Sequence, residues 1–275
     1  MKKILLGLLV IAMALALTAC SQETYSKLAE NMGKMGENVY GIEANMSDVN
    51  NATETVSASV AVQKDESGNV SATIDFATAA KITESVSAIM DSEQKTEALK
   101  QELAKPVIAE IDTSSMNEEE KQQAEEQQKQ QQQAVQAVLQ EKADTLASQF
   151  NAIIEAQATA SETEKLTEEQ VELITTVQEA LSSITISDNP TMAEVTTVAV
   201  LSEMATTVQT VATSDTSVYY GEEGLTEEGL AIADTALSSL DTLKVTSEVA
   251  GMDLLGDVDT MLASPTNRTF STLCP

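Results

Sequence analysis

The sequence predicts a mainly α-helical protein: an elongated bundle of five to seven helices with one β-hairpin near the N-terminus, at about residues 55–76. Two observations carry this prediction. Apolar residues recur at steps of three and four along most of the chain, which is the period of one face of an α-helix. They alternate with polar residues over two short runs that flank a polar turn, which is typical of a hairpin.

The N-terminal segment has the composition of an export signal. Lys2 and Lys3 form a short positive region, and an uncharged, largely apolar run follows over residues 4–17. A helix that spans a membrane needs about 20 apolar residues, and this run is shorter. It has instead the proportions of the apolar core of a signal peptide.

Residues 17–20, Leu-Thr-Ala-Cys, resemble the lipobox of bacterial lipoproteins. The resemblance implies cleavage between Ala19 and Cys20, a diacylglyceryl group on the Cys20 sulfur, and acylation of the new amine by a fatty acid such as palmitate. We therefore expect residues 1–19 to be a signal peptide and residues 20–27 a lipidated tether. Two or more acyl chains hold a protein stably on a bilayer, at about 0.8 kcal/mol per buried CH₂. The alternative is an ordinary secretory signal with an incidental cysteine.

The chain is strongly acidic and lacks the residues on which most catalytic sites depend. It has 44 Asp and Glu against 15 Lys and Arg, a net charge of −29, and loss of Lys2 and Lys3 with the signal would make it −31. Such a charge repels nucleic acid and anionic lipid headgroups. With no histidine, histidine-based catalysis is excluded. With neither histidine nor a free cysteine pair, a zinc site is not expected. We predict no enzyme activity and no cofactor.

Two acidic segments carry oxygens that could act as calcium ligands. Residues 65–69 include a glycine and several oxygen donors, but they lack the alternating acids and the closing Glu of a calcium loop. Asp253, Asp257 and Asp259 are merely close in sequence. With so many carboxylates such spacings arise by chance, so no metal site is predicted.

Residues 28–265 are expected to form the helical domain. Apolar steps of three and four predict a helix over 28–46, and the same period returns from Thr78 to Pro106. Between them, residues 56–62 and 70–76 alternate with period two. A lone hairpin is marginally stable in water, so its apolar face is expected to lie on the helices or to pair with another edge.

A Glu/Gln-rich helix is predicted over residues 116–160, with Ser115 and Glu118 resembling a capping box. Its first half, 118–133, has no large apolar residue. The second half carries an apolar stripe of Val135, Leu139, Ala143, Leu146, Phe150 and Ile153. At 1.5 Å per residue the helix would be about 67 Å long, more than a compact domain needs. Its Gln-rich half is thus expected to project into solvent or to be disordered, as a partner-binding arm or a solvated spacer.

The C-terminal half is predicted to be helical as well. Further helices are expected over 171–184, 190–211, 226–243 and 249–262, followed by a tail at 266–275. Thr167 and Gln170 resemble a capping box for the first of these, and Asn189-Pro190 would start the second. The Thr and Val content of the second favours a strand, but its apolar spacing favours a helix, and we follow the spacing.

The leading hypothesis is a membrane-anchored lipoprotein of the cell envelope that is not an enzyme but a structural or protein-interaction component. Its partner would be another envelope protein or a second copy of itself. The alternative is a helical binding module for a lipid or another hydrophobic small ligand. Ser21, in place of Asp, resembles the outer-membrane sorting signal of cells with two membranes. Cys274 is either an idle thiol or forms a disulfide between chains.

Overall fold

The computed structural model describes residues 46–157, 175, 178–179, 181–213, 218–221, 224–252 and 254. Over these residues the chain forms seven helices, one antiparallel hairpin of two five-residue strands, and a second hairpin with strands of two residues. The predicted mainly α fold with a hairpin near the N-terminus is confirmed. The predicted helix at 28–46, apart from Met46, and the capping box at Thr167 lie outside the described residues.

The first described helix, α3 (Ser47–Ala58), corrects the predicted start of the hairpin. Val56 and Ala58 were expected in a strand, yet they lie in α3. The buried residues Val49, Ala52 and Val56 are three and four positions apart, which is the spacing of a helix face. The valine and alanine positions fit both periods over so short a run, and the contacts of the helix face decide between them.

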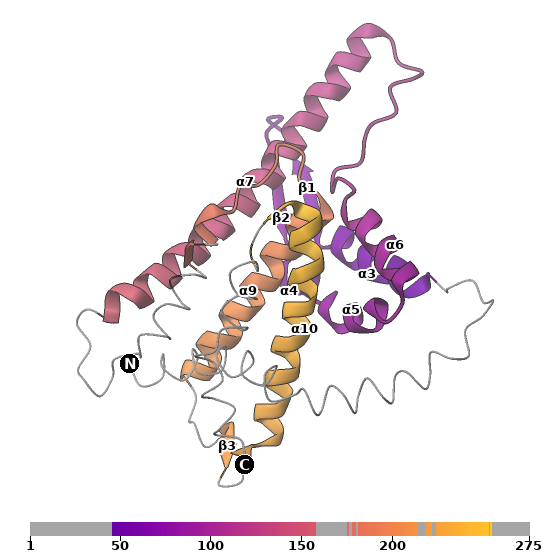
Figure 1. Cartoon of the computed structure of the whole chain (residues 1–275). Coiled ribbons are helices and arrows are strands. Elements are labelled where there is room, and N and C mark those ends of the chain that lie inside the picture. Colours follow the sequence, from indigo (N-terminus) through magenta and orange to yellow (C-terminus); the bar gives the residue numbers. More distant parts are fainter. Residues whose placement is uncertain are drawn as a thin grey trace, which may run out of the picture.

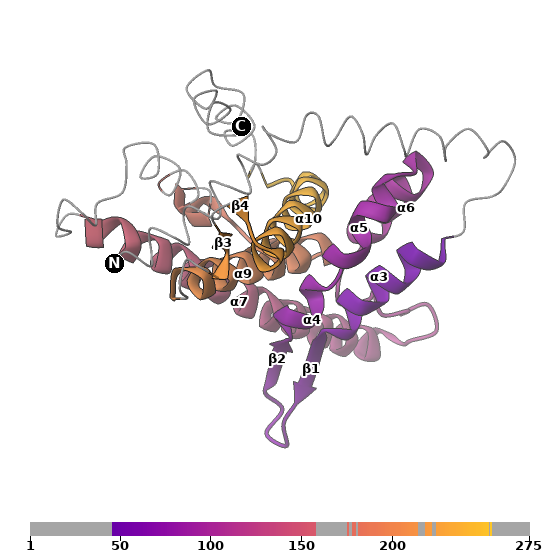
Figure 2. The ribbon, with the colours of Figure 1, turned by 90° about the horizontal axis from the view of Figure 1, so that it is seen from below.

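The hairpin consists of β1 (Val60–Lys64) and β2 (Val70–Ile74), paired antiparallel from Val60 opposite Ile74 to Lys64 opposite Val70. Its half-buried and buried side chains alternate with exposed ones along both strands. The apolar face lies on a long helix, as was expected of a hairpin that cannot stand alone. Its turn extends away from the helices (Figure 2).

Three short helices follow where the sequence suggested one continuous helical stretch. They are α4 (Phe76–Ala80), α5 (Thr83–Met90) and α6 (Glu93–Leu103). Asp75 caps α4 by accepting a hydrogen bond from the Thr78 amide at 3.1 Å. Ser92 occupies the corresponding position before α6, with an extended backbone that breaks the helix from α5. Such capping residues compete with helix continuation, so the chain turns at each of them.

The longest helix, α7 (Glu118–Gln157), confirms the predicted helix over 116–160 with slightly shorter bounds. Its stripe is inside the molecule: Val135, Leu139 and Ala143 have no exposed surface, and Leu146 and Phe150 are nearly buried. The preceding segment, 104–117, connects α6 to the far end of α7 (Figure 1). The first half of α7 extends beyond the other helices (Figure 1).

Helix α9 (Met192–Thr213) lies at the centre of the bundle, in contact with α3, α4, α6, α7 and α10. Residues 193–200 are buried on every side of the helix. This explains how a Val/Thr-rich sequence forms a helix, because tertiary burial overrides a weak intrinsic preference for strand. Thr196 satisfies its hydroxyl by donating to the Met192 carbonyl at 2.8 Å.

Helix α10 (Glu227–Ala250) packs along α9 and is joined to it through the small hairpin of β3 (Tyr220–Gly221) and β4 (Gly224–Leu225). The expected start at Thr226 is confirmed, since its hydroxyl accepts from the Gly229 amide at 3.1 Å. The predicted end at residue 243 is corrected: α10 continues to Ala250, so it includes the start of the helix predicted over 249–262, and Gly251 ends it with a φ of +68°.

One hydrophobic core joins the helices and the hairpin. Its fully buried side chains include Val56, Ile82, Val86, Ile89, Leu99, Leu103 and Leu139. Burial of each such side chain contributes about 1.5–3 kcal/mol. In the described part of the chain, no helix combines the length and the apolar character that crossing a bilayer requires.

Candidate interaction surface

Cys20, the predicted lipidation site, and Ala19, which precedes it at the predicted cleavage site, lie outside the described residues. The same holds for Asp253, Asp257 and Asp259. The structure does place the other calcium candidate, the turn at 65–69. Within the described ranges, no cluster of three or more acidic or cysteine side chains is arranged to hold a metal ion.

In that turn, the Asp65 carboxylate is occupied by the turn itself. One oxygen accepts from the amides of Ser67 and Asn69, both at 2.8 Å, and the other accepts from the Asn69 side chain at 2.8 Å. These hydrogen bonds, above all that from the Asn69 side chain, hold the pKa of Asp65 below its usual range. The carboxylate therefore shapes the hairpin turn and does not project towards a cation.

The exposed first half of α7, residues 118–133, is called the α7 arm. It begins at a capping box two residues later than predicted, at Asn117 and Glu120 rather than at Ser115 and Glu118. The Asn117 side chain accepts from the amides of Glu119 and Glu120 at 3.0 Å, and Glu120 accepts from the Asn117 amide at 2.9 Å. Three glutamates in the first turn also lie at the positive end of the helix dipole.

No residue of the arm is buried, so burial does not explain why the arm is helical. The arm consists of Glu, Gln, Lys and Ala, which all have a high helix propensity. Its 16 residues extend about 24 Å at 1.5 Å per residue. The arm is therefore a polar rod that local propensity and capping stabilise, and its surface is available for contacts.

Four glutamines at four-residue intervals, Gln128, Gln132, Gln136 and Gln140, form a row that we call the glutamine row. Their side-chain amides donate to neighbouring extended chain: Gln128 to the Ala109 carbonyl at 3.4 Å, Gln132 to the Asn189 side chain at 2.9 Å, Gln136 to the Ile186 carbonyl at 3.0 Å, and Gln140 to the Ile184 carbonyl at 3.3 Å. Gln140 also accepts from the Ile186 amide at 3.2 Å. The last three glutamines of the row thus fasten the segment before α9 along α7, and Gln128 contacts the segment that precedes α7.

The sequence did not reveal this role of the glutamines. The sequence predicts a partner-binding arm or a solvated spacer at 118–133, whereas the four glutamines of the row each donate to a group at least 19 residues away in the chain. The available signal was the spacing of the row, which places these four side chains on one helix face. That signal was hidden by the many other glutamines beside it.

A shallow depression of about 740 Å³ continues along α7 beyond the glutamine row. Its lining residues are Ala137, Gln140, Glu141, Asp144, Thr145, Ser148, Gln149 and Ala152. These residues lie on one face of α7, and most of their side chains are polar or charged. The surface of α7 therefore stays polar from the arm to the middle of the helix.

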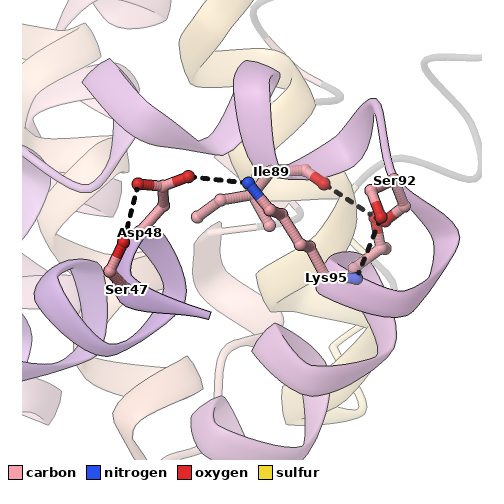
Figure 3. Close-up of polar contacts among 6 residues, drawn as sticks. Ser47, Asp48, Ile89, Ser92 and Lys95 are labelled. Carbon is pink, nitrogen blue, oxygen red and sulfur yellow. Dashed lines mark hydrogen bonds and ion pairs between the residues drawn. The ribbon is translucent and has the colours of Figure 1, made fainter. Parts of the chain in front are cut away.

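Ion pairs join helices α3, α6 and α10 to one another, away from α7. Lys95 on α6 donates to Asp48 on α3 at 2.7 Å, and Ser47 donates to the other oxygen of Asp48 (Figure 3). This hydrogen bond with Lys95 and the lysine charge lower the pKa of Asp48. Lys100 on α6 lies 2.8 Å from both carboxylate oxygens of Glu248 on α10. Helix α6 is thereby joined to α3 and to α10.

A buried carboxylate organises the start of α9. Glu194 is 3% exposed and accepts four hydrogen bonds, from the amides of Ser187 and Thr191, both at 2.7 Å, and from their hydroxyls at 2.9 and 3.1 Å. Thr191 accepts from the Glu194 amide in return, at 3.3 Å. The capping box is therefore Thr191 with Glu194, and the predicted start at Asn189-Pro190 is wrong by two residues. Pro190 precedes the cap, and its carbonyl accepts from the Val107 amide at 2.8 Å.

Two carboxyl groups have a raised pKa. Burial, followed by the charge of Glu84, raises the pKa of Glu203 on α9. Burial also raises the pKa of Asp241 on α10, against the opposing charge of Lys244. Neither group has a histidine beside it, because the sequence contains none.

The chain matches no protein-family model, no curated protein and no solved structure in these comparisons.

Proposed function

We propose that this chain is a lipid-anchored component of the cell envelope that has a structural or protein-contacting role. The α7 arm is the contact element. The observation that carries the proposal is a polar helix about 24 Å long that extends beyond the bundle (Figure 1) and buries none of its side chains. The proposal includes no catalytic activity, cofactor or metal ion.

The chemistry of the arm determines the kind of contact that it makes. Its exposed side chains are glutamates and glutamines with two lysines, so a partner meets hydrogen-bonding groups and a net negative charge. Contacts between exposed charges weaken as salt screens them, over about 8–10 Å at physiological ionic strength. The partner is another envelope protein or a second copy of the chain, and its binding depends on salt.

The lipid anchor on Cys20 supports the same role. An acidic body is repelled by anionic headgroups, so the acylated cysteine holds to the bilayer a chain that would otherwise leave it. The body then stands off the surface, with the arm as an extended element in the space beside the membrane. Where the cell has two membranes, Ser21 directs the chain to the outer one.

Site-specific photo-crosslinking in intact cells tests the contact role. A photoreactive residue is placed at Gln123 or Gln127, which are exposed on the arm, and at Glu54, which is equally exposed on α3. The proposal predicts a discrete cross-linked product from both arm positions and none from Glu54. Equal products from all three positions, or none from the arm, would contradict a contact role for the arm.

The anchor is tested separately in the same cells. Cys20→Ala in the arm-labelled protein is expected to abolish both membrane association and the discrete product, because the arm is no longer held beside its partner. A product that persists at full yield in soluble Cys20→Ala protein would show that the contact does not need the lipid. That result would remove the anchor from the proposal and leave the arm in it.

The alternative, a binding module for a hydrophobic small ligand, gains no support from the depression on α7. The depression is shallow and open to solvent, whereas a site for a small hydrophobic ligand encloses most of the surface of the ligand. We therefore do not propose it.

A further inference from the structure

Glu203, on the second half of α9, has a carboxylate oxygen that the rest of the fold does not satisfy. Its Oε2 atom is buried, and it is the one buried side-chain polar atom without a hydrogen-bond partner in the part of the chain that the structure describes. A buried carboxylate without a partner costs free energy when it is charged and much less when it binds a proton. The geometry therefore favours the protonated form.

The charged group that acts on Glu203 is another carboxylate. Glu84, at the start of α5, raises the pKa of Glu203 further, after burial. Helix α4, which packs closely on α9, has no ionisable residue that could offset this repulsion.

Several other charged groups on the helices around α9 are engaged elsewhere. On α10, Asp241 interacts with Lys244, and Glu248 binds Lys100 of α6. On α3 and α6, Asp48 binds Lys95, and Glu102 binds Lys105. On α7, Lys142 lies over the ring of Phe76, 5.4 Å from its centre. No cation among the described residues is paired with Glu203.

Glu203 also marks a change in the packing of α9. Residues 193–200 are completely enclosed, whereas residues 201–207, which we call the distal half of α9, are half-buried except for the exposed Thr206. A segment with fewer buried contacts opens at a lower free-energy cost than the enclosed turns before it. A charge buried there can reach water by loosening this segment.

We propose that Glu203 is a proton-binding site that controls how tightly the distal half of α9 packs against the bundle. Binding of a proton removes the repulsion from Glu84 and consolidates this segment. Loss of the proton restores the unpaired charge on the buried oxygen and its repulsion by Glu84, and the segment loosens. This inference concerns the folded body and does not depend on the proposed anchor or on the α7 arm.

The first test follows thermal unfolding between pH 4 and pH 8 for the full chain, for Glu203→Gln and for the matched control Glu54→Gln. A raised pKa means that the stabilisation is present below the ordinary carboxyl pKa and is lost as the pH rises through the raised value. Glu203→Gln should raise Tm at pH 8 beyond the control, by about 3–5 °C for each tenfold gain in proton affinity on folding. The difference should vanish at pH 4.

Two outcomes of this test overturn the proposal. One is a Tm for Glu203→Gln at pH 8 that is equal to or below that of the control, because the charged carboxylate would then have no cost. The other is a difference in Tm between Glu203→Gln and the control that has the same size at pH 4 and at pH 8. Such a difference would come from the packing of the amide and not from the charge.

Hydrogen exchange locates the effect within the fold. After correction for the intrinsic pH dependence, amides of residues 201–207 should lose protection between pH 5 and pH 8 in the wild-type chain. They should keep it in Glu203→Gln, and residues 193–200 should be unchanged in both. Protection of 201–207 that does not depend on pH in the wild-type chain would also overturn the proposal.

Discussion

Glu194→Gln hardly changes the shape of the side chain. It should nevertheless destabilise this chain more than most substitutions of that kind. Glu194 accepts from the amide and hydroxyl of Ser187 and of Thr191, and its side chain is almost completely buried. Glutamine keeps the size of the side chain but turns one acceptor oxygen into a donor. In place of a hydrogen bond, an NH₂ group then faces a backbone N–H.

The magnitude follows from the number and kind of hydrogen bonds. A hydrogen bond to a charged group contributes about 1.5–3 kcal/mol, and a buried donor that loses its partner costs about 1–3 kcal/mol. The exchange weakens both amide contacts and leaves at least one amide facing a donor. We expect a loss of about 3 kcal/mol, which corresponds to a fall in Tm of about 6–12 °C for a domain of this size.

Urea unfolding followed by circular dichroism measures this loss, with Glu54→Gln as the control. Glu54 is exposed on α3, so its exchange removes the same charge without a buried contact, and the expected change is within about 0.5 kcal/mol. If Glu194→Gln changes the free energy of unfolding no more than the control does, the four hydrogen bonds are not what fixes the start of α9.

Three further predictions concern other contacts. Gln140→Ala leaves the amide of the buried Ile186 without its side-chain acceptor and should cost about 1–3 kcal/mol in urea unfolding, whereas Ala at the exposed Gln133 of the same helix should change little. Gly251→Ala places a side chain at a φ of +68°, where its Cβ meets no neighbouring atom within 4 Å, so the cost is the conformational one alone, about 1–2 kcal/mol; a neutral result would refute it. The Thr78 hydroxyl and then its amide lower the pKa of Asp75, so this stabilisation is present above the ordinary aspartate pKa and is lost as the pH falls through the lowered value. Asp75→Ala should remove that part of the acid dependence of Tm, and an unchanged profile would contradict the cap.

Periodicity predicted the helices well where the apolar stripe was long. The stripe from Val135 to Phe150 has five members, and all of them are buried. The hairpin boundary failed because Val56 and Ala58 satisfy a period of two and lie in a helix as well. Over three or four residues the two periods cannot be separated, and the neighbouring contacts decide.

Capping residues were the least predictable feature, because several candidates lie side by side. Ser115, Asn117, Asn189 and Thr191 are all residue types that favour the position before a helix. In the structure, Asn117 and Thr191 each form a reciprocal pair of hydrogen bonds with the glutamate three residues later. Ser115 also has a glutamate three residues later, Glu118, so the sequence pattern alone could not choose between the two caps.

The candidate interaction surface was predicted in outline and not in detail. The absence of large apolar residues from 118–133 predicted that this half of the helix would be exposed if it was ordered, and it is ordered and exposed. The contacts of the glutamine row, such as that of Gln136 with Ile186, join segments 50 residues apart in the chain. A local pattern contains no information on such long-range contacts.

The intact mass of the native protein, extracted from membranes, shows whether a lipidated cysteine ties this acidic body to a membrane. We expect a chain that begins at Cys20 and carries the added mass of a diacylglyceryl group and further acylation. A chain that retains residues 1–19, or one that begins at Cys20 with an unmodified sulfur, would contradict it.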